Sequence, residues 1–348
     1  MKTFDEIFID KTKHGVKVQT SEYKEQGRHV IIDQGQSQVA GYTDREEGVF
    51  EEIPVIIFGD HTRVIKYVEK PFFLGADGVK VLRSKDENAN YKYLYYALKH
   101  ARIPNTGYNR HFKWLREINI KYPESDRQTE IVNILDKVSS IIHQRKQELQ
   151  RLDELIQARF VELFGDPVSN IKGWKRVTID ECVDSIENGK SFVCDSMARI
   201  GEEPAILKLS AATYGVYKPE ENKAIINESD FIEGAEVHSG DLLFTRKNTP
   251  ELVGMAAYVF MTPKKLMMPD LIFRINTKQN CRKIYLWKLI NHELFRSQIQ
   301  NLASGSAKSM SNISKERLGK LHICLPPLDL QIEFEKFVIQ INKSKVAA

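Results

Sequence analysis

The apolar positions between residues 123 and 164 recur in alternating steps of four and three, and no glycine or further proline follows Pro123 there. The repeating positions are Ile131, Leu135, Val138, Ile142, Leu149, Leu152 and Ile156. Only Arg145 breaks the series. This heptad pattern is typical of a helix that packs along another helix. It predicts one helix of roughly 38 residues and about 57 Å, ended by Gly165 and Pro167.

A partner helix is predicted from Pro326 onwards, with the apolar residues Phe334, Val338 and Ile341 at similar spacing. Its entry repeats the entry of the first helix. The pattern Pro-x-x-Asp-x-Gln-x-Glu starts at Pro123 and again 203 residues later, at Pro326. Shared identities together with a shared apolar spacing indicate an internal repeat.

The repeat extends upstream of both helices, at offsets that grow along the chain. The matched positions are Leu115, Ile118 and Ile120 with Leu318, Leu321 and Ile323, Asn109 with Asn312, Tyr93 with Tyr285, 56–58 with 242–244, and Thr3–Glu6 with Thr178–Glu181. A chain of 348 residues has room for two ordinary domains and helical arms. We therefore expect an α+β fold of two repeated β-rich globular units, each followed by a helix. The expected boundaries are 1–122, 123–165, 166–325 and 326–348.

Short apolar runs bounded by polar or glycine-containing turns predict the strands of both units. In the first unit they are 16–18, 28–32, 53–58, 64–68 and 78–82, after a strand-like segment at 4–8, with a helix at 91–100. In the second unit they are 205–209, 240–245, 254–259 and 271–275, followed by a helix at 285–302.

Composition narrows the class of protein only slightly. Hydrophobic residues make up 42% of the chain, and the formal net charge is +4 with a pI near 8.6. Such mild basicity permits nucleic-acid binding without arguing for it, because charge must be clustered to attract a ligand. Cys182, Cys194, Cys281 and Cys324 form no Cys-x-x-Cys pair, so we expect buried thiols in a reducing cytoplasm. We expect no signal peptide, membrane span or low-complexity segment.

Four segments of the first unit carry motifs that are informative in combination. They are Ile32-Asp33-Gln34-Gly35-Gln36, Ala40-Gly41-Tyr42-Thr43-Asp44, Phe58-Gly59-Asp60-His61-Thr62-Arg63 and Leu74-Gly75-Ala76-Asp77-Gly78. Together with the repeated layout of domain and helix, they resemble the target recognition domains of type I restriction-modification specificity subunits. The resemblance covers nearly the whole chain.

The resemblance implies a DNA-reading subunit without chemistry of its own. Each recognition domain would read one half of a split target in double-stranded DNA. The two helices would pack as an antiparallel coiled coil that spaces the domains and binds modification subunits, two of them, and restriction subunits would join through the complex. S-adenosylmethionine, ATP and Mg would be bound by those partner subunits and not by this chain.

Candidate DNA contacts in the first unit lie in polar turns. Gln34, Gln36, His61 and Arg63 are candidates because glutamine suits adenine and arginine suits guanine. The alternative is that the turn around His61 only hydrogen-bonds itself. Asn105, Tyr108 and Arg110 belong to a second candidate loop, which mixes amide, aromatic and basic groups suited to base and phosphate contacts. A plain surface loop is the alternative there.

In the second unit, the basic turn Arg246, Lys247, Asn248 and Thr249 follows a predicted strand, as the His61 turn does in the first. Solvated charge is the alternative to DNA contact. Residues 303–314 form a serine-rich loop in which Ser306, Lys308 and Ser309 are candidate phosphate contacts. Asn312 and Ser314 are predicted to cap the following short helix instead of contacting bases.

Several catalytic readings are disfavoured. Gly189-Lys190-Ser191 resembles the end of a phosphate-binding loop, but Asp184 stands where that motif needs glycine, and no clear strand precedes it. Residues 325–328 lack the Asn or Asp and the aromatic residue of the methyltransferase motif, and no metalloprotease or serine-hydrolase signature is present. A non-catalytic recognition subunit is the leading interpretation. The alternatives are a recognition module that acts alone or serves another modification enzyme, and a nuclease with an unrecognised site.

The second predicted helix is too short to cover the first along its length. We therefore expect Leu149, Leu152 and Ile156 to be exposed as an apolar patch. Two interpretations stay open: a truncated chain, or self-association through this helix seam.

Overall fold

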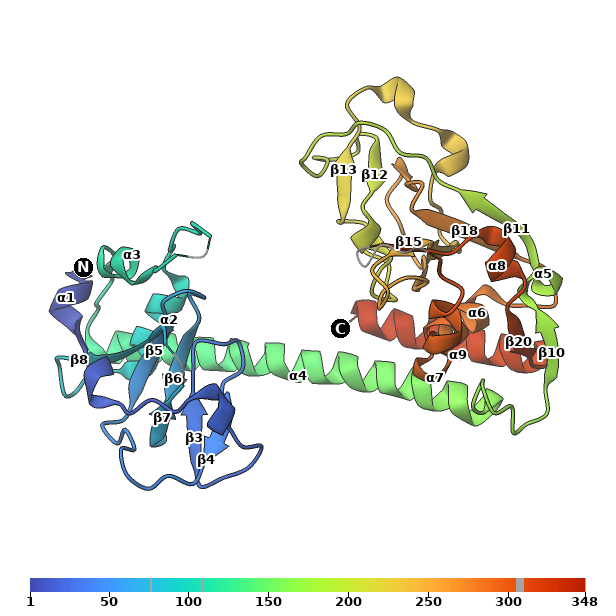
Figure 1. The fold of residues 1–348 in the computed structure, drawn as a ribbon. Helices are drawn as coiled ribbons and strands as arrows, with labels where there is room; N and C mark the ends of the chain where they lie inside the picture. Colours follow the sequence, from blue (N-terminus) through green and yellow to red (C-terminus); the bar gives the residue numbers. More distant parts are fainter. Residues whose placement is uncertain (76, 108, 305–309, 348) are drawn as a thin grey trace. The chain divides into compact units, whose positions relative to one another are not determined.

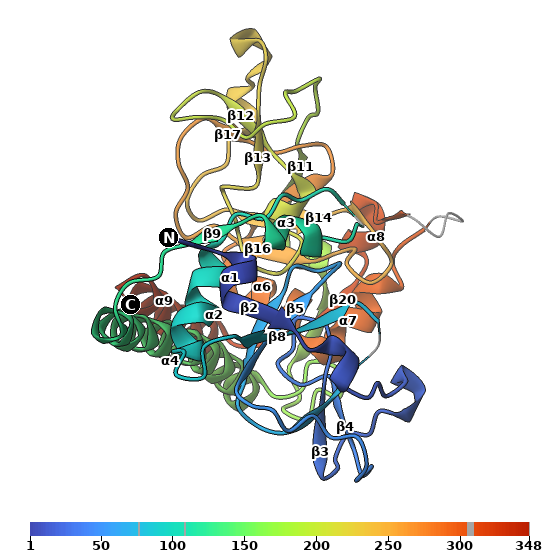
Figure 2. The ribbon, with the colours of Figure 1, turned by 90° about the vertical axis from the view of Figure 1, so that its left-hand side faces the viewer.

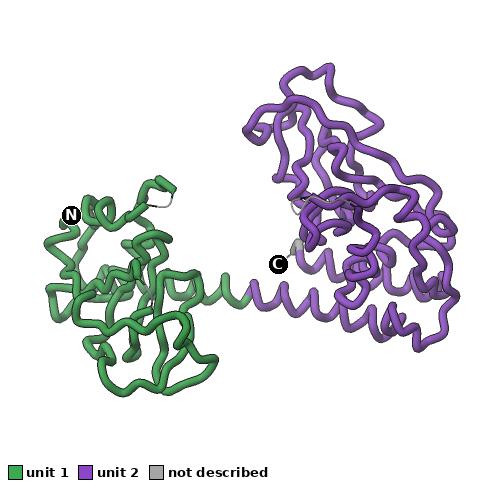
Figure 3. The backbone as a smooth tube through the Cα atoms, in the orientation of Figure 1, with its two compact units in different colours: residues 1–144 green, residues 145–348 purple. Residues whose placement is uncertain are grey.

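The computed structural model describes residues 1–75, 77–107, 109–304 and 310–347. These residues form two compact units, 1–144 and 145–348, which Figure 3 shows in different colours. The long helix α4 (Ser125–Phe164) contributes its first half to unit 1 and its second half to unit 2. Within the described ranges, none of the helices is long and apolar enough to cross a lipid bilayer.

Unit 1 combines short strands with helices that follow them in sequence. Ahead of α4 its elements are β1 (Lys2–Thr3), α1 (Phe4–Ile7), β2 (Phe8–Asp10), β3 (His29–Ile32), β4 (Gly41–Thr43), β5 (Val55–Gly59), β6 (Ile65–Val68), β7 (Phe72–Leu74), β8 (Val79–Ser84), α2 (Tyr91–His100), α3 (Phe112–Arg116) and β9 (Asn119–Ile120). The described strands form sheets in the orders β2-β8-β5-β6, β4-β3-β7 and β1-β9. Only β3 and β7 pair in parallel among them.

Unit 2 repeats this order with additions. Its elements are β10 (Lys175–Thr178), α5 (Ile179–Cys182), β11 (Val183–Asn188), β12 (Ala205–Leu207), β13 (Asn222–Ala224), β14 (Leu242–Thr245), β15 (Lys247–Asn248), β16 (Ala256–Tyr258), β17 (Leu266–Met267), β18 (Ile272–Thr277), α6 (Lys283–Asn291), α7 (Glu293–Gln300), β19 (Ser311–Asn312), α8 (Lys315–Gly319), β20 (His322–Leu325) and α9 (Leu328–Ala347). The sheet orders are β11-β18-β14-β16, β13-β12-β17, β10-β20 and β15-β19.

The predicted duplication is confirmed strand by strand. Replacing β2, β8, β5 and β6 by β11, β18, β14 and β16 gives the second large sheet, and β12 pairs in parallel with β17 as β3 does with β7. Among the described strands and α-helices, β15, α7 and β19 of unit 2 have no counterpart in unit 1, and two 3-10 helices at 228–230 and 233–235 are further additions. Matched side chains make matched bonds: the Tyr93 hydroxyl donates to the Lys121 carbonyl at 2.7 Å, and the Tyr285 hydroxyl donates to the Cys324 carbonyl at 2.6 Å.

Each large sheet is buried on both faces, which explains the unbroken apolar runs of its central strands. In β5, Ile56 and Phe58 pack with α2 residues, whereas Val55 and Ile57 pack with residues of β3 and β7. The helix α2 lies against β5 and β6, and its counterpart α6 lies against β14 and β16 (Figure 1 and Figure 2). A central strand covered from both sides needs no polar alternation.

The second half of α4 and α9 pack antiparallel inside unit 2, as the resemblance implied. Arg159 pairs with Glu333, and Asp153 pairs with Lys345, so position numbers rise along one helix as they fall along the other. The rings of Phe160 and Phe334 lie 5.6 Å apart. Aromatic packing of this kind adds to the apolar area that the helices bury.

The exposed part of the seam lies earlier in α4 than expected. Ile156 is only 3% exposed and Leu152 is half-buried, so the prediction of an exposed Ile156 is wrong. Ile156 belongs to the core cluster that contains Phe334 and Val338 of α9, and Ile341 packs against that cluster. At the other end, Ile131 packs on the unit 1 core and Leu135 is half-buried. Between Ile131 and Leu152, the large exposed apolar residues of α4 are Ile134, Val138, Ile141, Ile142 and Leu149.

Three secondary-structure predictions are wrong. The strand-like segment 4–8 is mostly the helix α1, because the Thr3 hydroxyl and the Glu6 carboxylate form a capping box. Segment 16–18 makes only an isolated bridge, between Lys17 and Leu74. The predicted helix 285–302 is two helices, because His292 has extended backbone angles between α6 and α7.

Candidate nucleic-acid interface

The turn that follows β5 in unit 1 is fastened to the loop before α3. The backbone amides of His111 and Phe112 donate to the Asp60 carbonyl and to the Asp60 carboxylate, each at 2.8 Å. Asp60 is buried, so these two hydrogen bonds replace the hydrogen bonds to water that its carbonyl and carboxylate groups lose on folding. The structure therefore brings together the two candidate loops of this unit, which the sequence placed some 50 residues apart.

Gln34 supports this turn from within. Its side-chain oxygen accepts from the His61 amide at 3.1 Å, its side-chain nitrogen donates to the Asp77 carbonyl at 3.0 Å, and the Thr62 hydroxyl donates to its main-chain carbonyl at 2.6 Å. Gly78 has φ 89°, a backbone conformation that favours glycine, and a Cβ atom there would lie 2.6 Å from the Gln34 side-chain nitrogen. With both ends of its amide engaged, Gln34 positions His61 and does not project freely.

Arg63 occupies the left-handed region at φ 59° and donates to the Ile103 carbonyl at 3.3 Å. Beside it lies a polar cavity of about 530 Å³. Its polar and charged lining residues are Gln36, Gln38, Thr62, Arg63, Lys66 and Lys99. Gln36 is exposed. The cavity therefore gathers two of the predicted residues, Gln36 and Arg63, with further cations next to them.

Lys66 is a residue that the sequence analysis missed. Its side chain is 2% exposed, and its amine donates to the Ser37 carbonyl at 2.5 Å and to the Asp33 carboxylate at 3.4 Å. Burial lowers the pKa of Lys66, and Asp33 opposes that shift. The sequence did contain a pattern that indicates burial of Lys66, since the alternation in β6 puts Lys66 on the same inward face as Val68.

The second candidate loop of unit 1 is exposed. The Asn105 side chain accepts from the Gly107 amide at 3.2 Å, which forms the turn. Arg110 is exposed and lies near Asp77, whose pKa is lowered first by Lys17 and also by the charge of Arg110. Tyr108 lies outside the described residues. Arg110 is thus the exposed cation of this loop.

In unit 2, Arg246 links the turn after β14, which corresponds to the turn after β5, to Asn312. Its Nε and Nη2 donate to the Asn312 side-chain oxygen at 3.3 and 3.2 Å, and its guanidinium lies 5.1 Å from the centre of the Phe273 ring. The backbone of Lys247 in β15 pairs with that of Asn312 in β19, and Asn312 also pairs with Ser304. The basic turn therefore adjoins both ends of the serine-rich loop. Ser306, Lys308 and Ser309 themselves lie outside the described residues.

Asn248 and Ser314 have structural roles. Asn248 is buried, donates to the Thr213 hydroxyl at 3.2 Å and accepts from the Thr249 amide at 2.9 Å. The Ser314 hydroxyl accepts from the Arg317 amide at 3.3 Å, which confirms it as the N-cap of α8. Asn312 was predicted to share that role, but its side chain binds Arg246 instead. Lys247, half-buried, and Thr249, exposed, are the described candidates nearest to solvent in this turn.

The segment 189–191 is not built as a phosphate-binding loop. The strand β11 does lead into it, contrary to the expectation from sequence, but no helix follows before residue 204 in the described chain. The Ser191 hydroxyl donates to the Asp270 carboxylate at 2.5 Å, and a Cβ on Gly189 would meet the Pro269 carbonyl at 2.2 Å. A carboxylate and carbonyl oxygens repel phosphate, so this site does not fit an anion.

No candidate metal-binding site is present in the described part of the chain. Groups of three or more His, Cys, Asp or Glu side chains that are placed to hold a metal ion do not occur among those residues. The cysteines are free thiols, with Cys182, Cys281 and Cys324 buried as predicted and Cys194 only half-buried.

Comparison with known proteins gives consistent similarities. The family described as "Type I restriction modification DNA specificity domain" matches residues 2–151 and again residues 171–344. The chain is 31% identical over 163 residues to the type I restriction enzyme EcoEI specificity subunit of Escherichia coli, covering 46% of this chain and 27% of that relative. It is 28% identical over 151 residues to the EcoR124I/EcoR124II specificity subunit of the same organism, covering 40% of this chain and 37% of that relative. The matched segments thus span well under half of these relatives.

One solved structure has a similar fold over nearly the whole length of this chain. The S subunit of a type I restriction-modification system from M. genitalium aligns with 99% of this chain and 90% of its own, at a TM-score of 0.60 and 15% identity. At this identity the likeness concerns the fold alone.

Proposed function

Because this chain belongs to the family of type I restriction-modification DNA specificity domains, we propose that it is the DNA-reading subunit of a type I restriction-modification complex. Each unit reads one half of a bipartite target in double-stranded DNA. The chain performs no catalysis itself. It binds modification subunits, two of them, and restriction subunits join through the complex, with S-adenosylmethionine, ATP and Mg held by those partners.

One observation carries this proposal. In both units, basic and amide side chains lie where the turn after β5 or β14 meets the loop before α3 or α8, and we call this place the corner of the unit. In unit 1 the corner joins the turn after β5 to the loop before α3, through the bond from the His111 amide to Asp60. In unit 2 the Ile313 amide donates to the Arg246 carbonyl at 2.8 Å and joins the turn after β14 to the loop before α8. Arginine and lysine suit phosphate and guanine, and asparagine and glutamine suit adenine.

The repeated corner supports a reader of two half-sites better than a single broad contact. Its supporting groups, Asp60, Gln34, Asn248 and Arg246, hold the loops from inside. The exposed groups differ between the units, with Gln36 and Arg110 in one and Thr249 in the other. A shared scaffold that carries different exposed side chains suits the reading of two different half-sites.

The exposed apolar stretch of α4 between Ile134 and Leu149 supports a protein partner on this helix. A modification subunit or a second copy of this chain would cover it, since apolar side chains at helical spacing favour a helix in that position. Self-association belongs to the proposal on the same ground.

The proposal is tested by mapping methylated positions in DNA from cells that express the complex with two single variants. Arg63→Asn keeps the left-handed backbone that asparagine tolerates, and it should relax one half of the target. Lys247→Gln should relax only the other half. Loss of both halves in either variant, or an unchanged target in both, would contradict independent half-site reading by these corners.

A further inference from the structure

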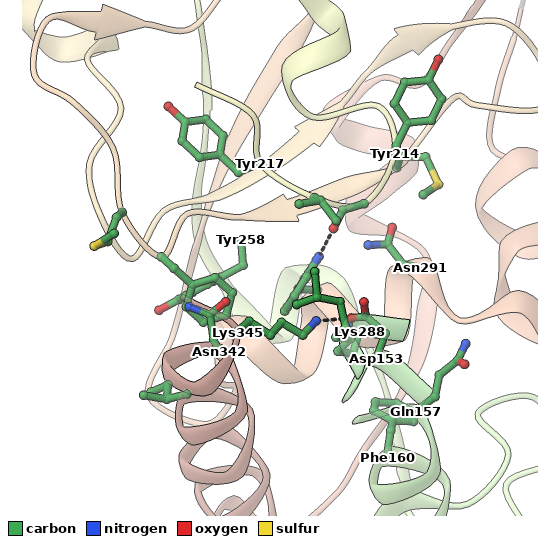
Figure 4. Close-up of a pocket in the computed structure, with 18 of the residues that line it drawn as sticks. Asp153, Gln157, Phe160, Tyr214, Tyr217, Tyr258, Lys288, Asn291, Asn342 and Lys345 are labelled. Carbon is green, nitrogen blue, oxygen red and sulfur yellow. Dashed lines mark hydrogen bonds and ion pairs between the residues drawn. The ribbon is translucent and has the colours of Figure 1, made fainter. Parts of the chain in front are cut away.

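Unit 2 contains a cavity of about 980 Å³ that none of the DNA-reading residues lines. It lies between α4, α9, α6, the loop 214–219 and the end of β16, as Figure 4 shows. Its apolar lining includes the side chains of Phe160, Tyr214, Tyr217, Tyr258, Phe260 and Trp287. A cavity of this size, mostly apolar with a few polar groups, has the character of a small-molecule site.

The walls of the cavity are held in place by hydrogen bonds. The Trp287 indole donates to the carbonyls of Gly215 and Ala256 at 3.0 and 3.2 Å. Asn291 donates to the Ala256 carbonyl at 2.7 Å and accepts from the Ala256 amide at 3.0 Å. The loop 214–219, the strand β16 and the helix α6 are thereby joined around the opening. A site with such fixed walls needs little reorganisation to accept a ligand.

The charged side chains that line the cavity are predominantly positive. They are Lys288 of α6, Lys343 and Lys345 of α9, and Asp153 of α4. Asp153 is already paired with Lys345. His292 also lines the cavity, and burial lowers its pKa, which favours the neutral ring. The field in the cavity therefore favours an anion.

Lys288 is the charged group of the cavity that lacks a hydrogen-bonding or ion-pair partner among the described residues. Its amine lies 4.0 Å from the centre of the Trp287 ring, and it makes no hydrogen bond or ion pair with the residues that the structure describes. Burial lowers the pKa of Lys288 to about 8, and the nearby Asp153 only partly opposes this shift. Lys288 is half-buried, and a partly desolvated cation that forms no ion pair is destabilising, so an anionic ligand would remove that cost.

We propose that this cavity binds a small organic anion with an aromatic body, whose charged group pairs with Lys288 and whose ring packs against Trp287, Tyr258 and Phe260. Those three rings already pack together and form an aromatic surface. The ring centres of Tyr258 and Trp287 lie 6.1 Å apart, and those of Phe260 and Trp287 lie 5.8 Å apart. This site is separate from the DNA-reading corners and does not depend on the proposed function.

Two dyes of the same shape test the proposal on the full chain. Anilinonaphthalene sulfonate carries a sulfonate on an aromatic body, and N-phenylnaphthylamine is its uncharged counterpart. We expect saturable one-to-one binding of the sulfonate, seen by titration calorimetry and fluorescence. Lys288→Met should weaken that binding about tenfold or more, while the affinity for the neutral dye changes less than about twofold, because only the charged bond is lost.

Lys336→Met on the exposed part of α9 is the matched control, since it removes one lysine charge outside the cavity. It should leave the binding of both dyes unchanged. Equal weakening by Lys288→Met and Lys336→Met, or no effect of Lys288→Met on the sulfonate, would overturn the proposal.

A second measurement needs no variant and so does not depend on folding of Lys288→Met. Acetic anhydride at pH 8 should acetylate Lys288 in the free protein, because much of its amine is neutral there. Saturating sulfonate dye should slow that labelling several-fold, as read by peptide mass spectrometry, and should leave Lys336 labelling unchanged. Undiminished labelling of Lys288 in the presence of bound dye would place the dye elsewhere.

Discussion

The side-chain amide of Gln331 donates a hydrogen bond of 2.8 Å to the Pro326 carbonyl, five residues earlier at the start of α9. Gln128 makes the same bond, also at 2.8 Å, to Pro123 at the start of α4. Both glutamines are buried. A repeated buried amide that closes a helix entry is a structural role, because its loss leaves an unpaired carbonyl.

Replacement of Gln331 should destabilise unit 2. Its amide also accepts from the Arg282 amide at 2.8 Å and donates to the Asn280 carbonyl at 3.2 Å. Gln331→Met should lower the free energy of unfolding by about 2–4 kcal/mol, and Gln128→Met, which loses the bond to Pro123 and a hydrogen-bonding contact with Tyr122, by about 1–2 kcal/mol. Urea unfolding measures both values. Equal costs would contradict the greater role of Gln331.

The buried ion pair of Arg274 and Asp241 gives a second stability prediction. Their side chains lie 3.0 Å apart and are 10% and 11% exposed, and Arg274 also pairs with Glu187 at 3.0 Å. Asp241→Asn should cost about 2–4 kcal/mol, because the arginine stays buried with less compensation. The control Glu148→Gln breaks the exposed pair with Arg145, where we expect a change below about 0.5 kcal/mol. Thermal unfolding compares them.

Lys288 predicts a specific dependence of stability on pH. Its folded pKa of about 8 lies below the ordinary lysine value of 10.5, so between these values the unfolded chain binds more protons. The free energy of unfolding should therefore rise with pH across that window, and the penalty is fully present below pH 8. Lys288→Met should be more stable than the parent by about 1–3 kcal/mol at pH 7, with the difference shrinking by pH 10. A difference that stays constant with pH would exclude this cause.

The exposed face of α4 predicts association. Val138 and Ile142 are 45% and 51% exposed, so Val138→Glu with Ile142→Glu should leave unfolding within about 0.5 kcal/mol while reducing self-association or binding of a partner helix. Sedimentation of the isolated chain over a concentration series measures the first effect. Lys137→Glu, at an exposed neighbouring position, changes the net charge by the same two units and is the control. A strict monomer at high concentration would exclude self-association.

DNA affinity should fall steeply with salt if phosphates dominate the contact. Lys247→Gln should reduce the slope of log affinity against log salt by about 1. Arg246→Met should have a larger effect, because it also releases Asn312 and with it the β15–β19 pair. Anisotropy titrations with the complex measure the slopes, and a flat response of the parent protein would argue against DNA binding.

The duplication was predictable because its signals are local. Thr3 and Glu6 form a capping box that Thr178 and Glu181 repeat, and the glutamine after each Pro-x-x-Asp entry recurs with its bond. The central strands were predictable for a similar reason, since burial on both faces produces an unbroken apolar run.

What the sequence could not predict depends on contacts between distant residues. The strand β7 (Phe72–Leu74) is recognisable only from its parallel pairing with β3, some 40 residues earlier. The role of Gln34 needs His61 and Asp77 on either side of it, so its type alone suggested base contact. The break at His292 likewise has no glycine or proline to announce it.

Two strands and one α-helix of unit 2 that have no counterpart in unit 1 lie near the basic turn or the serine-rich loop. The strand β15, which belongs to the basic turn, pairs with β19, and α7 precedes β19 in the chain. The strand order of the four-stranded sheet is the same in both units despite these insertions. A loop graft confined to this corner should therefore change what the unit recognises while leaving its hydrophobic interior as it was, which makes the corner the natural place for specificity to be exchanged.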